Sequence, residues 1–291
     1  IYINKKRLDA AGLEVPKQWT LEEYAEYARK LTEGEGADKV YGSTGFHSNY
    51  YWTMPVRGLL GDDFWYKEDG TSNFDHPAYR TALEFKYNLE NVEKVQFPFT
   101  EYAATKTPTF DLFMQDRVAM AEASNAITRY VMDTENYPRD FITTVAPLPT
   151  LEAGQSTNYN EGIYQFGILS MGAKSKEKEA SWTFIKWLST EGSKYLAQVG
   201  HIPTWKKGNK EEIMQIMFGD NPEQVIDTEA FKNVVLNFDG PGYQDTIFDG
   251  YSEINKIHQD EAEKYLFDAA TLDEAIQNMK TKSDEAIRQA K

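Results

Sequence analysis

Three consecutive aromatic residues, Tyr50, Tyr51 and Trp52, are the first feature of the sequence that could carry chemistry. They follow a short segment punctuated by glycine and lack the spacing of a buried helix face, so we expect them in a loop. Asn125 follows a predicted strand, where a rigid scaffold commonly presents polar side chains to a ligand. Aromatic faces stack on apolar surfaces and amides bind hydroxyl groups. These residue types indicate non-covalent binding.

Each candidate also has a structural interpretation. One or two of the three aromatic side chains could cap the hydrophobic core, and Asn125 could be a turn residue, because Asn favours turns. Trp182 and Trp187 lie at helical spacing, so we expect them in the core. Both interpretations of the loop residues stay open at the level of the sequence.

Catalytic motifs and metal-ligand motifs are missing from the sequence. There is no Cys, which excludes thiol nucleophiles and Cys-ligated metals, and the four His residues are scattered. No GxSxG, P-loop, GxGxxG or calcium-loop pattern occurs. We expect no metal and no cofactor. A pair of carboxylates acting as a glycan hydrolase stays an alternative, because 46 Asp and Glu residues offer many pairs.

Charge and hydropathy limit the partners. With 31 Lys and Arg against 46 Asp and Glu, the formal charge of the 291 residues is −15. Such a field repels nucleic acid and anionic membrane surfaces, so neither is an expected direct partner. No apolar window reaches the length of a membrane span, and the first residues lack the apolar core of a signal peptide.

The elements that must position the candidate residues alternate between helix and strand in most of the chain. Thr20 and Glu23 form a predicted capping box for a helix from Leu21 that ends near Gly34. Asp75 is the expected N-cap of a helix from Pro77. Strands are predicted at 117–121, 141–149 and 166–170, and helices at 109–114, 178–187, 211–218, 229–236, 245–266 and 272–290. This order predicts a mixed α/β protein with a helical final third.

Three segments, in this order, resemble one known family. They are IYINKKRLDAAGLEVPKQWTLEEY, FDLFMQDRVAMAEASNAITRY and FGILSMGAKSKEKEASWTFIKWLSTEGSKYLAQVGHIPT, and the closing LFDAATLDEAIQNMKTKSDEAI is similar to the family's final helix. The family is that of the extracytoplasmic solute-binding proteins of ABC sugar importers, which includes maltose-binding protein. Two departures stand out: Gln115-Asp116 replaces the family's Gly-Lys, and Ser124-Asn125-Ala126 stands where an aromatic residue is common.

The resemblance implies an α/β, two-lobed fold of the type II periplasmic-binding-protein kind. It assigns 1–167 and 228–291 to a helix-rich second lobe that is nearly complete, and 168–227 to the returning part of a truncated first lobe. The N-terminal part of that first lobe, roughly 100 residues or one small domain, is expected to lie outside the sequence, together with a secretion signal and a lipid anchor.

The resemblance further implies the substrate-binding component of an ABC transporter, which captures a carbohydrate, expected to be an oligosaccharide, without catalysis. Its partner would be a membrane permease, and its location extracytoplasmic, either periplasmic or lipid-anchored at the cell surface. A glycan hydrolase and a binder of non-sugar solutes or polypeptides are the alternatives. The expected ligand-binding residues are Tyr50, Tyr51, Trp52, Asn125, Glu161, Tyr243 and Gln244.

Overall fold

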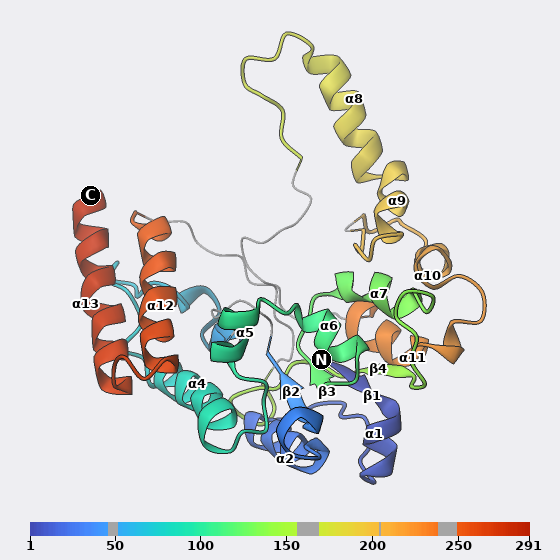
Figure 1. Ribbon diagram of the computed structural model, residues 1–291. Helices are drawn as coiled ribbons and strands as arrows, with labels where there is room; N and C mark the ends of the chain where they lie inside the picture. The colour runs from blue at the N-terminus through green and yellow to red at the C-terminus, as the bar shows by residue number, and fades with distance from the viewer. Residues whose placement is uncertain (46–51, 156–168, 204, 238–248) are drawn as a thin grey trace.

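The fold contains a mixed four-stranded sheet, which Figure 1 shows together with the surrounding helices. Figure 1 is drawn from a computed structural model. The structure describes residues 1–45, 52–155, 169–203, 205–237 and 249–291. The strands are β1 (Tyr2–Asn4), β2 (Tyr41–Thr44), β3 (Val118–Ala121) and β4 (Thr143–Val145), in the spatial order β2-β3-β1-β4. Strand β1 is antiparallel to β3 and β4, whereas β2 and β3 are parallel. The carboxyl ends of β2 and β3 therefore lie at the same edge.

Helices surround this sheet and dominate the C-terminal part. They are α1 (Lys5–Ala10), α2 (Leu21–Leu31), α3 (Met54–Leu60), α4 (Pro77–Tyr87), α5 (Phe99–Thr105), α6 (Thr109–Met114), α7 (Thr128–Met132), α8 (Lys178–Ser189), α9 (Lys194–Ala197), α10 (Lys210–Phe218), α11 (Thr228–Phe231), α12 (Tyr251–Leu266) and α13 (Leu272–Ala290). A π-helical turn, Asn88–Val92, continues α4.

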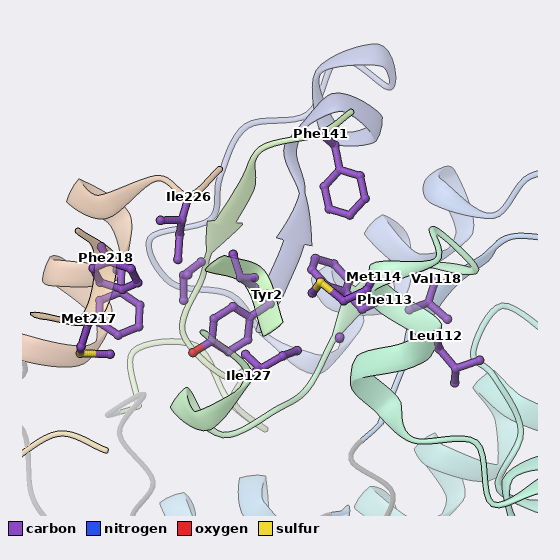
Figure 2. Packing of buried hydrophobic residues seen from close by; sticks show 14 of the residues in the cluster. Tyr2, Leu112, Phe113, Met114, Val118, Ile127, Phe141, Met217, Phe218 and Ile226 are labelled. Atoms are coloured by element: carbon purple, nitrogen blue, oxygen red, sulfur yellow. The ribbon is translucent and has the colours of Figure 1, made fainter. Parts of the chain in front are cut away.

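Both faces of the sheet are buried. Tyr2 points into one hydrophobic cluster, which Phe113, Ile127 and Phe218 also join, as Figure 2 shows. Its neighbour Ile3 belongs to a second cluster on the α2 side, because successive residues of a strand face opposite ways. A third cluster unites Trp52 and α4 with the last two helices.

Local signals in the sequence predicted several helix ends correctly. The Thr20–Glu23 capping box is present: the Thr20 hydroxyl accepts from the Glu23 N–H at 3.3 Å, and Glu23 accepts from the Thr20 N–H at 2.7 Å. Two expectations are wrong. Helix α2 ends earlier, at Leu31 rather than near Gly34. The N-cap of α4 is His76, because Asp75 instead pairs with Lys67 at 2.6 Å.

The predicted strand 141–149 is reduced to Thr143–Val145. Pro147 and Pro149 have no backbone N–H, so the end of the segment cannot continue a ladder. The Pro147 carbonyl instead accepts from Trp19 Nε1 at 2.7 Å. The segment therefore leaves the sheet and covers the start of α2.

Asp116, in the turn before β3, has a left-handed backbone with φ of 57°. Its carboxylate makes a bidentate pair with Arg7, with both N···O distances 2.7 Å, and accepts from Asn4 Nδ2 at 2.8 Å. These bonds tie the turn before β3 to the start of α1, and they offset the strain that a side chain adds to a left-handed residue.

The expectation that Trp182 and Trp187 lie in the core is wrong in this structure. Their side chains are 56% and 45% exposed, and α8 stands away from the sheet in Figure 1. Helix α10 lies later in the segment 168–227, which the sequence assigns to the first lobe. Unlike α8, it packs on the sheet, because its residues Ile213 and Phe218 share a cluster with Tyr2. The lobe boundaries expected from the sequence stay a prediction.

Candidate functional site

The candidate site lies where the parallel strands β2 and β3 end. Thr44 and Ala121 pair at the last position of the two strands, and the Glu122 N–H donates to the Thr44 carbonyl at 3.0 Å. Gly45 and Glu122 therefore leave the sheet side by side. The crevice outside the carboxyl ends of parallel strands is a common ligand site in α/β proteins.

A pocket with about 620 Å³ of space, partly open to solvent, adjoins this edge. Apolar side chains form most of its wall: Ile1, Leu21, Tyr24, Trp52, Met54, Pro55, Ala82, Phe85, Leu148 and Pro149. Three polar side chains complete it: Lys86, Gln96 and Glu122. A mostly apolar wall with a few placed polar groups is typical of small-molecule sites.

The three polar side chains converge on Gly45. A Cβ atom added at Gly45 would lie 3.7 Å from Gln96 Nε2, 3.7 Å from Lys86 Nζ and 3.8 Å from Glu122 Oε2. These are ordinary contact distances, so the glycine leaves room for roughly one methyl group before the polar groups are reached. A larger side chain at this position would fill the polar end of the pocket.

Gln96 is held in place by the backbone. The segment around it runs parallel to β2: the Phe97 N–H donates to the Ser43 carbonyl at 2.8 Å, and the Ser43 N–H donates to the Val95 carbonyl at 3.2 Å. The Ser43 hydroxyl also donates to Gln96 Oε1 at 3.2 Å. The amide is thus fixed before any ligand arrives.

Lys86 and Glu90 form a buried ion pair at the same place. Glu90 lies on the π-helical turn after α4, and it also accepts from Gln96 Nε2 at 2.9 Å and from the Phe99 N–H at 3.1 Å. Removing one partner from a buried pair typically costs about 3–5 kcal/mol, because the other charge is left uncompensated. A smaller hollow, partly open to solvent, shares Gly45 and Lys86 with the pocket.

Tyr24 adds a hydroxyl group to the wall. Burial raises the pKa of Tyr24 well above its ordinary value, although a hydrogen bond with Ser43 acts in the opposite direction. The phenol therefore stays protonated at neutral pH and keeps its capacity to donate.

Of the two expected ligand residues that the structure describes, Trp52 lies in the wall of this pocket. It lies two residues before the start of α3, it is 6% exposed, and its ring meets that of Tyr79 edge to face, with 6.2 Å between the centroids. Its Nε1 is buried and has no hydrogen-bond partner in the described ranges. Trp52 is thus both a core residue and part of the wall, which combines the two interpretations of the aromatic run.

Asn125 lies elsewhere. Its Nδ2 donates to the Gly200 carbonyl at 2.6 Å, and a Cβ at Gly200 would come within 2.8 Å of the Asn125 carbonyl oxygen. The amide therefore joins two distant segments at a close backbone approach, and it does not line the pocket. Its assignment to the ligand stays a prediction.

The other expected ligand residues, Tyr50, Tyr51, Glu161, Tyr243 and Gln244, lie outside the described residues. Sequence reasoning missed Gly45, Lys86, Gln96 and Glu122. Glu122 directly follows a correctly predicted strand, so the rule that sites lie beyond strand ends could have identified it. Lys86 and Glu90 carry no such signal, because they have the spacing of an ordinary surface pair.

Metal and membrane signals are missing where the structure is described. In those ranges no group of three His, Asp or Glu residues is placed to hold a metal ion. None of the described helices combines the length and apolar character that a membrane crossing requires.

The chain belongs to the bacterial extracellular solute-binding protein family, whose sequence model matches residues 1–195. No curated protein matches the chain in sequence. Solved structures match it closely in fold and confirm the expected α/β, two-lobed binding-protein fold.

Three solved structures illustrate this likeness. A sugar transporter from Rhizobium etli in an open conformation is 17% identical, with a TM-score of 0.73 over 100% of this chain and 70% of the other. A Listeria monocytogenes ABC substrate-binding protein in complex with cycloalternan is 19% identical, with a TM-score of 0.69. The match covers 98% of this chain and 68% of the Listeria chain. A maltose-bound MalE3 of T. maritima is 20% identical, with a TM-score of 0.67. The match covers 96% of this chain and 68% of the MalE3 chain.

Proposed function

We propose that this protein captures a carbohydrate outside the cytoplasm and delivers it to the membrane permease of an ABC importer. Family membership supports capture of a solute as the general role. Two solved proteins of the same fold carry cycloalternan and maltose, which supports a saccharide as the ligand class.

The observation that carries the proposal is the composition of the pocket at the strand ends. Sugars present apolar C–H faces and a rim of hydroxyl groups, so a sugar site needs flat apolar walls and fixed polar groups. The wall near Trp52 and Phe85 supplies the first requirement. Gln96, Lys86 and Glu122 supply the second, with amide, ammonium and carboxylate groups around one glycine.

The role proposed for the pocket is binding without chemistry. Glu90, a carboxylate next to the pocket, is occupied by Lys86, Gln96 and a backbone N–H, so it is poorly placed to exchange a proton with a ligand. Closure of two lobes around the ligand would then drive delivery, because contacts from both lobes exist only in the closed state. The lobes proposed are 1–167 with 228–291, and 168–227 as part of the other.

The proposal extends to the location and to the remaining ligand residues. The protein would act in the periplasm or at the cell surface, where a lipid anchor holds such proteins. Tyr50, Tyr51, Tyr243 and Gln244 would contribute rings and an amide to the sugar, and Glu161 a carboxylate. An oligosaccharide is the ligand size that we propose.

Titration calorimetry against mono- and oligosaccharides tests this function, together with a variant that fills the pocket. Gly45→Leu places a side chain among Gln96, Lys86 and Glu122, so it should lower the affinity for the bound sugar at least tenfold. Gly172→Leu is the matched control, because nothing lies within 4 Å of a Cβ at that position and its affinity should be unchanged.

Two results would contradict the proposal. The first is that no saccharide of the panel binds to the wild-type protein. The second is that Gly45→Leu binds a sugar as tightly as wild type does, which would move the site away from this pocket. Turnover of aryl glycosides by the wild-type protein would instead support a hydrolase.

A further inference from the structure

We propose that Lys86 and Gln96 together recognise one hydroxyl oxygen of the ligand as a hydrogen-bond acceptor, and that Glu90 is the positioning residue for both. The inference rests on the carbohydrate-binding function proposed above, and it adds to that function which kind of atom the polar end of the pocket selects. The arrangement that carries it is a buried carboxylate that holds two donor groups next to each other beside Gly45.

Glu90 is an acceptor that the protein itself has filled. Its side chain is 2% exposed, and its Oε1 accepts both from Lys86 Nζ and from Gln96 Nε2, the latter at 2.9 Å. Its Oε2 accepts from the Phe99 N–H at 3.1 Å. Because the two side-chain nitrogen atoms are bonded to the same oxygen, they are neighbours. With three donors satisfied inside the protein, this carboxylate has little remaining capacity for a ligand.

The amide of Gln96 has one orientation that satisfies its neighbours. A carboxylate only accepts, so the end that faces Glu90 is the Nε2 end, and the Ser43 hydroxyl donates to Oε1 at 3.2 Å. The amide nitrogen carries two N–H groups, of which Glu90 takes one. Among the residues that the structure describes, the second N–H of Gln96 has no acceptor.

Lys86 also has donors left over. Its ammonium group carries three N–H groups, and Glu90 is its acceptor within the described ranges. The ammonium group also lies over the ring of Phe99, 5.8 Å from the centroid. The Lys86 side chain is only 11% exposed, and a buried donor without an acceptor costs free energy. An oxygen atom of a ligand in the pocket would supply the missing acceptor.

Gly45 leaves the space in which that oxygen fits. Lys86 Nζ and Gln96 Nε2 each lie 3.7 Å from the position of a Cβ at Gly45, and both residues line the pocket. Glu122 lines the same end, but it has a further interaction within the protein, so the available donors are those of Lys86 and Gln96. Both nitrogen atoms donate and neither accepts. A sugar hydroxyl matches them, because its two lone pairs can accept both hydrogen bonds while its O–H donates elsewhere.

The test is titration calorimetry with glucose, galactose, mannose and maltose, and with the monodeoxy and monodeoxyfluoro derivatives of each. For wild type, deoxygenation at one hydroxyl of the bound sugar should weaken binding about tenfold or more, because two donors, one of them charged, lose their acceptor. The deoxyfluoro derivative at the same position should bind about threefold or more tightly than the deoxy derivative, because a C–F bond accepts weakly and cannot donate.

Two variants assign this hydroxyl to its protein partners. Lys86→Met combined with Glu90→Gln removes both charges of the buried pair, so no uncompensated charge is left behind. In this variant the loss on deoxygenation at that position should shrink to less than about threefold. Gln96→Met removes the other donor and should reduce the same loss about threefold or more. Losses at the other hydroxyls should stay unchanged in both variants, which a merely structural role of these residues would not produce.

Glu26→Gln combined with Lys30→Met is the matched control. This acid–base pair has the same spacing of four, but it is about half exposed, and neither residue lines the pocket. The loss on deoxygenation should therefore keep its wild-type value. Unfolding midpoints show whether the variants fold. If the variant at Lys86 and Glu90 does not, Gln96→Met and the wild-type comparison of deoxyfluoro with deoxy sugars decide.

The inference is overturned if no hydroxyl of the bound sugar shows both wild-type effects. It is also overturned if the folded variants leave the loss at that hydroxyl unchanged, if they act at different hydroxyls, or if the control reduces the loss equally. Each of these results contradicts only this inference, because a sugar still binds. Failure of all four parent sugars to bind contradicts the proposed function itself.

Discussion

The hairpin of α12 and α13 buries one face of each helix in a cluster with α4, whereas α8 buries none of its side chains. Met279 of α13 is fully buried, but Trp182 and Phe184 of α8 are each 56% exposed. All three helices have apolar residues at helical spacing. Helical spacing of apolar residues therefore predicts that a helix has an apolar face. Only the fold decides whether another element packs on that face.

The exposed apolar surface is concentrated in one region. Most of the exposed large hydrophobic side chains in the described ranges lie between 169 and 199: Leu169, Trp182, Phe184, Trp187, Tyr195, Leu196 and Val199. Within this region the rings of Phe184 and Trp187, and those of Trp187 and Tyr195, lie near each other, with centroids 6.2 Å and 6.3 Å apart. The C-terminal hairpin exposes far fewer, with Phe267 at 47% directly after α12.

Charged groups differ between the two regions as well. Glu261 of α12 is buried at 1% exposure, and it accepts from Lys264 Nζ and Lys282 Nζ at 2.6 Å and from Asn278 Nδ2 at 3.0 Å. Two of these donors lie on α13, so the carboxylate links the hairpin. The comparable acidic residue of α8, Glu179, is exposed.

The largest difference between the regions should appear on truncation of an apolar side chain. Met279→Ala removes a fully buried side chain, and the resulting cavity should lower the free energy of unfolding by about 2–5 kcal/mol. Trp182→Ala should change it by less than about 0.5 kcal/mol, since the ring is already exposed. Urea unfolding of both variants measures the contrast. Equal losses would mean that α8 is packed in solution.

Replacing the linking carboxylate should have an intermediate effect. Glu261→Gln loses charge-assisted hydrogen bonds, and we expect a loss of about 1.5–3 kcal/mol at pH 7. Glu179→Gln is the matched control on α8 and should be neutral. An equal loss in the control would show that the effect reflects net charge and not the bonds across the hairpin.

The same substitution predicts a pH dependence. Burial acts to raise the pKa of Glu261, but hydrogen bonds from Lys264, Lys282 and Asn278 outweigh burial, so the pKa is lowered. A pKa below the unfolded value, about 4.3, means that the contribution is present above that pH and is lost as pH falls through the folded value. Between pH 7 and pH 3, wild type should therefore lose more stability than Glu261→Gln, as thermal unfolding midpoints would show.

The smallest effect concerns the helix starts. Thr271 and Glu274 form a capping box at α13, whereas α8 has no side-chain cap. Thr271→Ala should cost about 1 kcal/mol, and Glu177→Ala at the start of α8 should cost almost nothing. Denaturation curves with equal slopes and shifted midpoints would measure this difference. A neutral Thr271→Ala would show that packing alone holds the end of α13.

The sequence by itself determined features that depend on neighbours three or four residues apart. Both ends of α6 (Thr109–Met114) and of α13 (Leu272–Ala290) agree with the prediction from the sequence, as does the capping box of α2. A cap is satisfied within one turn of the chain, so its signal is complete in the sequence. The resemblance to a binding-protein family likewise rests on segments that are contiguous in the chain, and family membership is confirmed.

Only the tertiary structure decided which polar groups are buried. Glu26–Lys30 and Lys86–Glu90 are both acid–base pairs with a spacing of four, and in the sequence they are equivalent. The first is about half exposed, while the second is enclosed by Phe99 and Gln96, residues that arrive from beyond the helix. Burial of these charges depends on contacts with distant segments of the chain. Helical periodicity reports only the pattern within one helix, so it does not predict those contacts. For that physical reason only the fold defines the site at Gly45, where Lys86, Gln96 and Glu122 come together from separate segments of the chain.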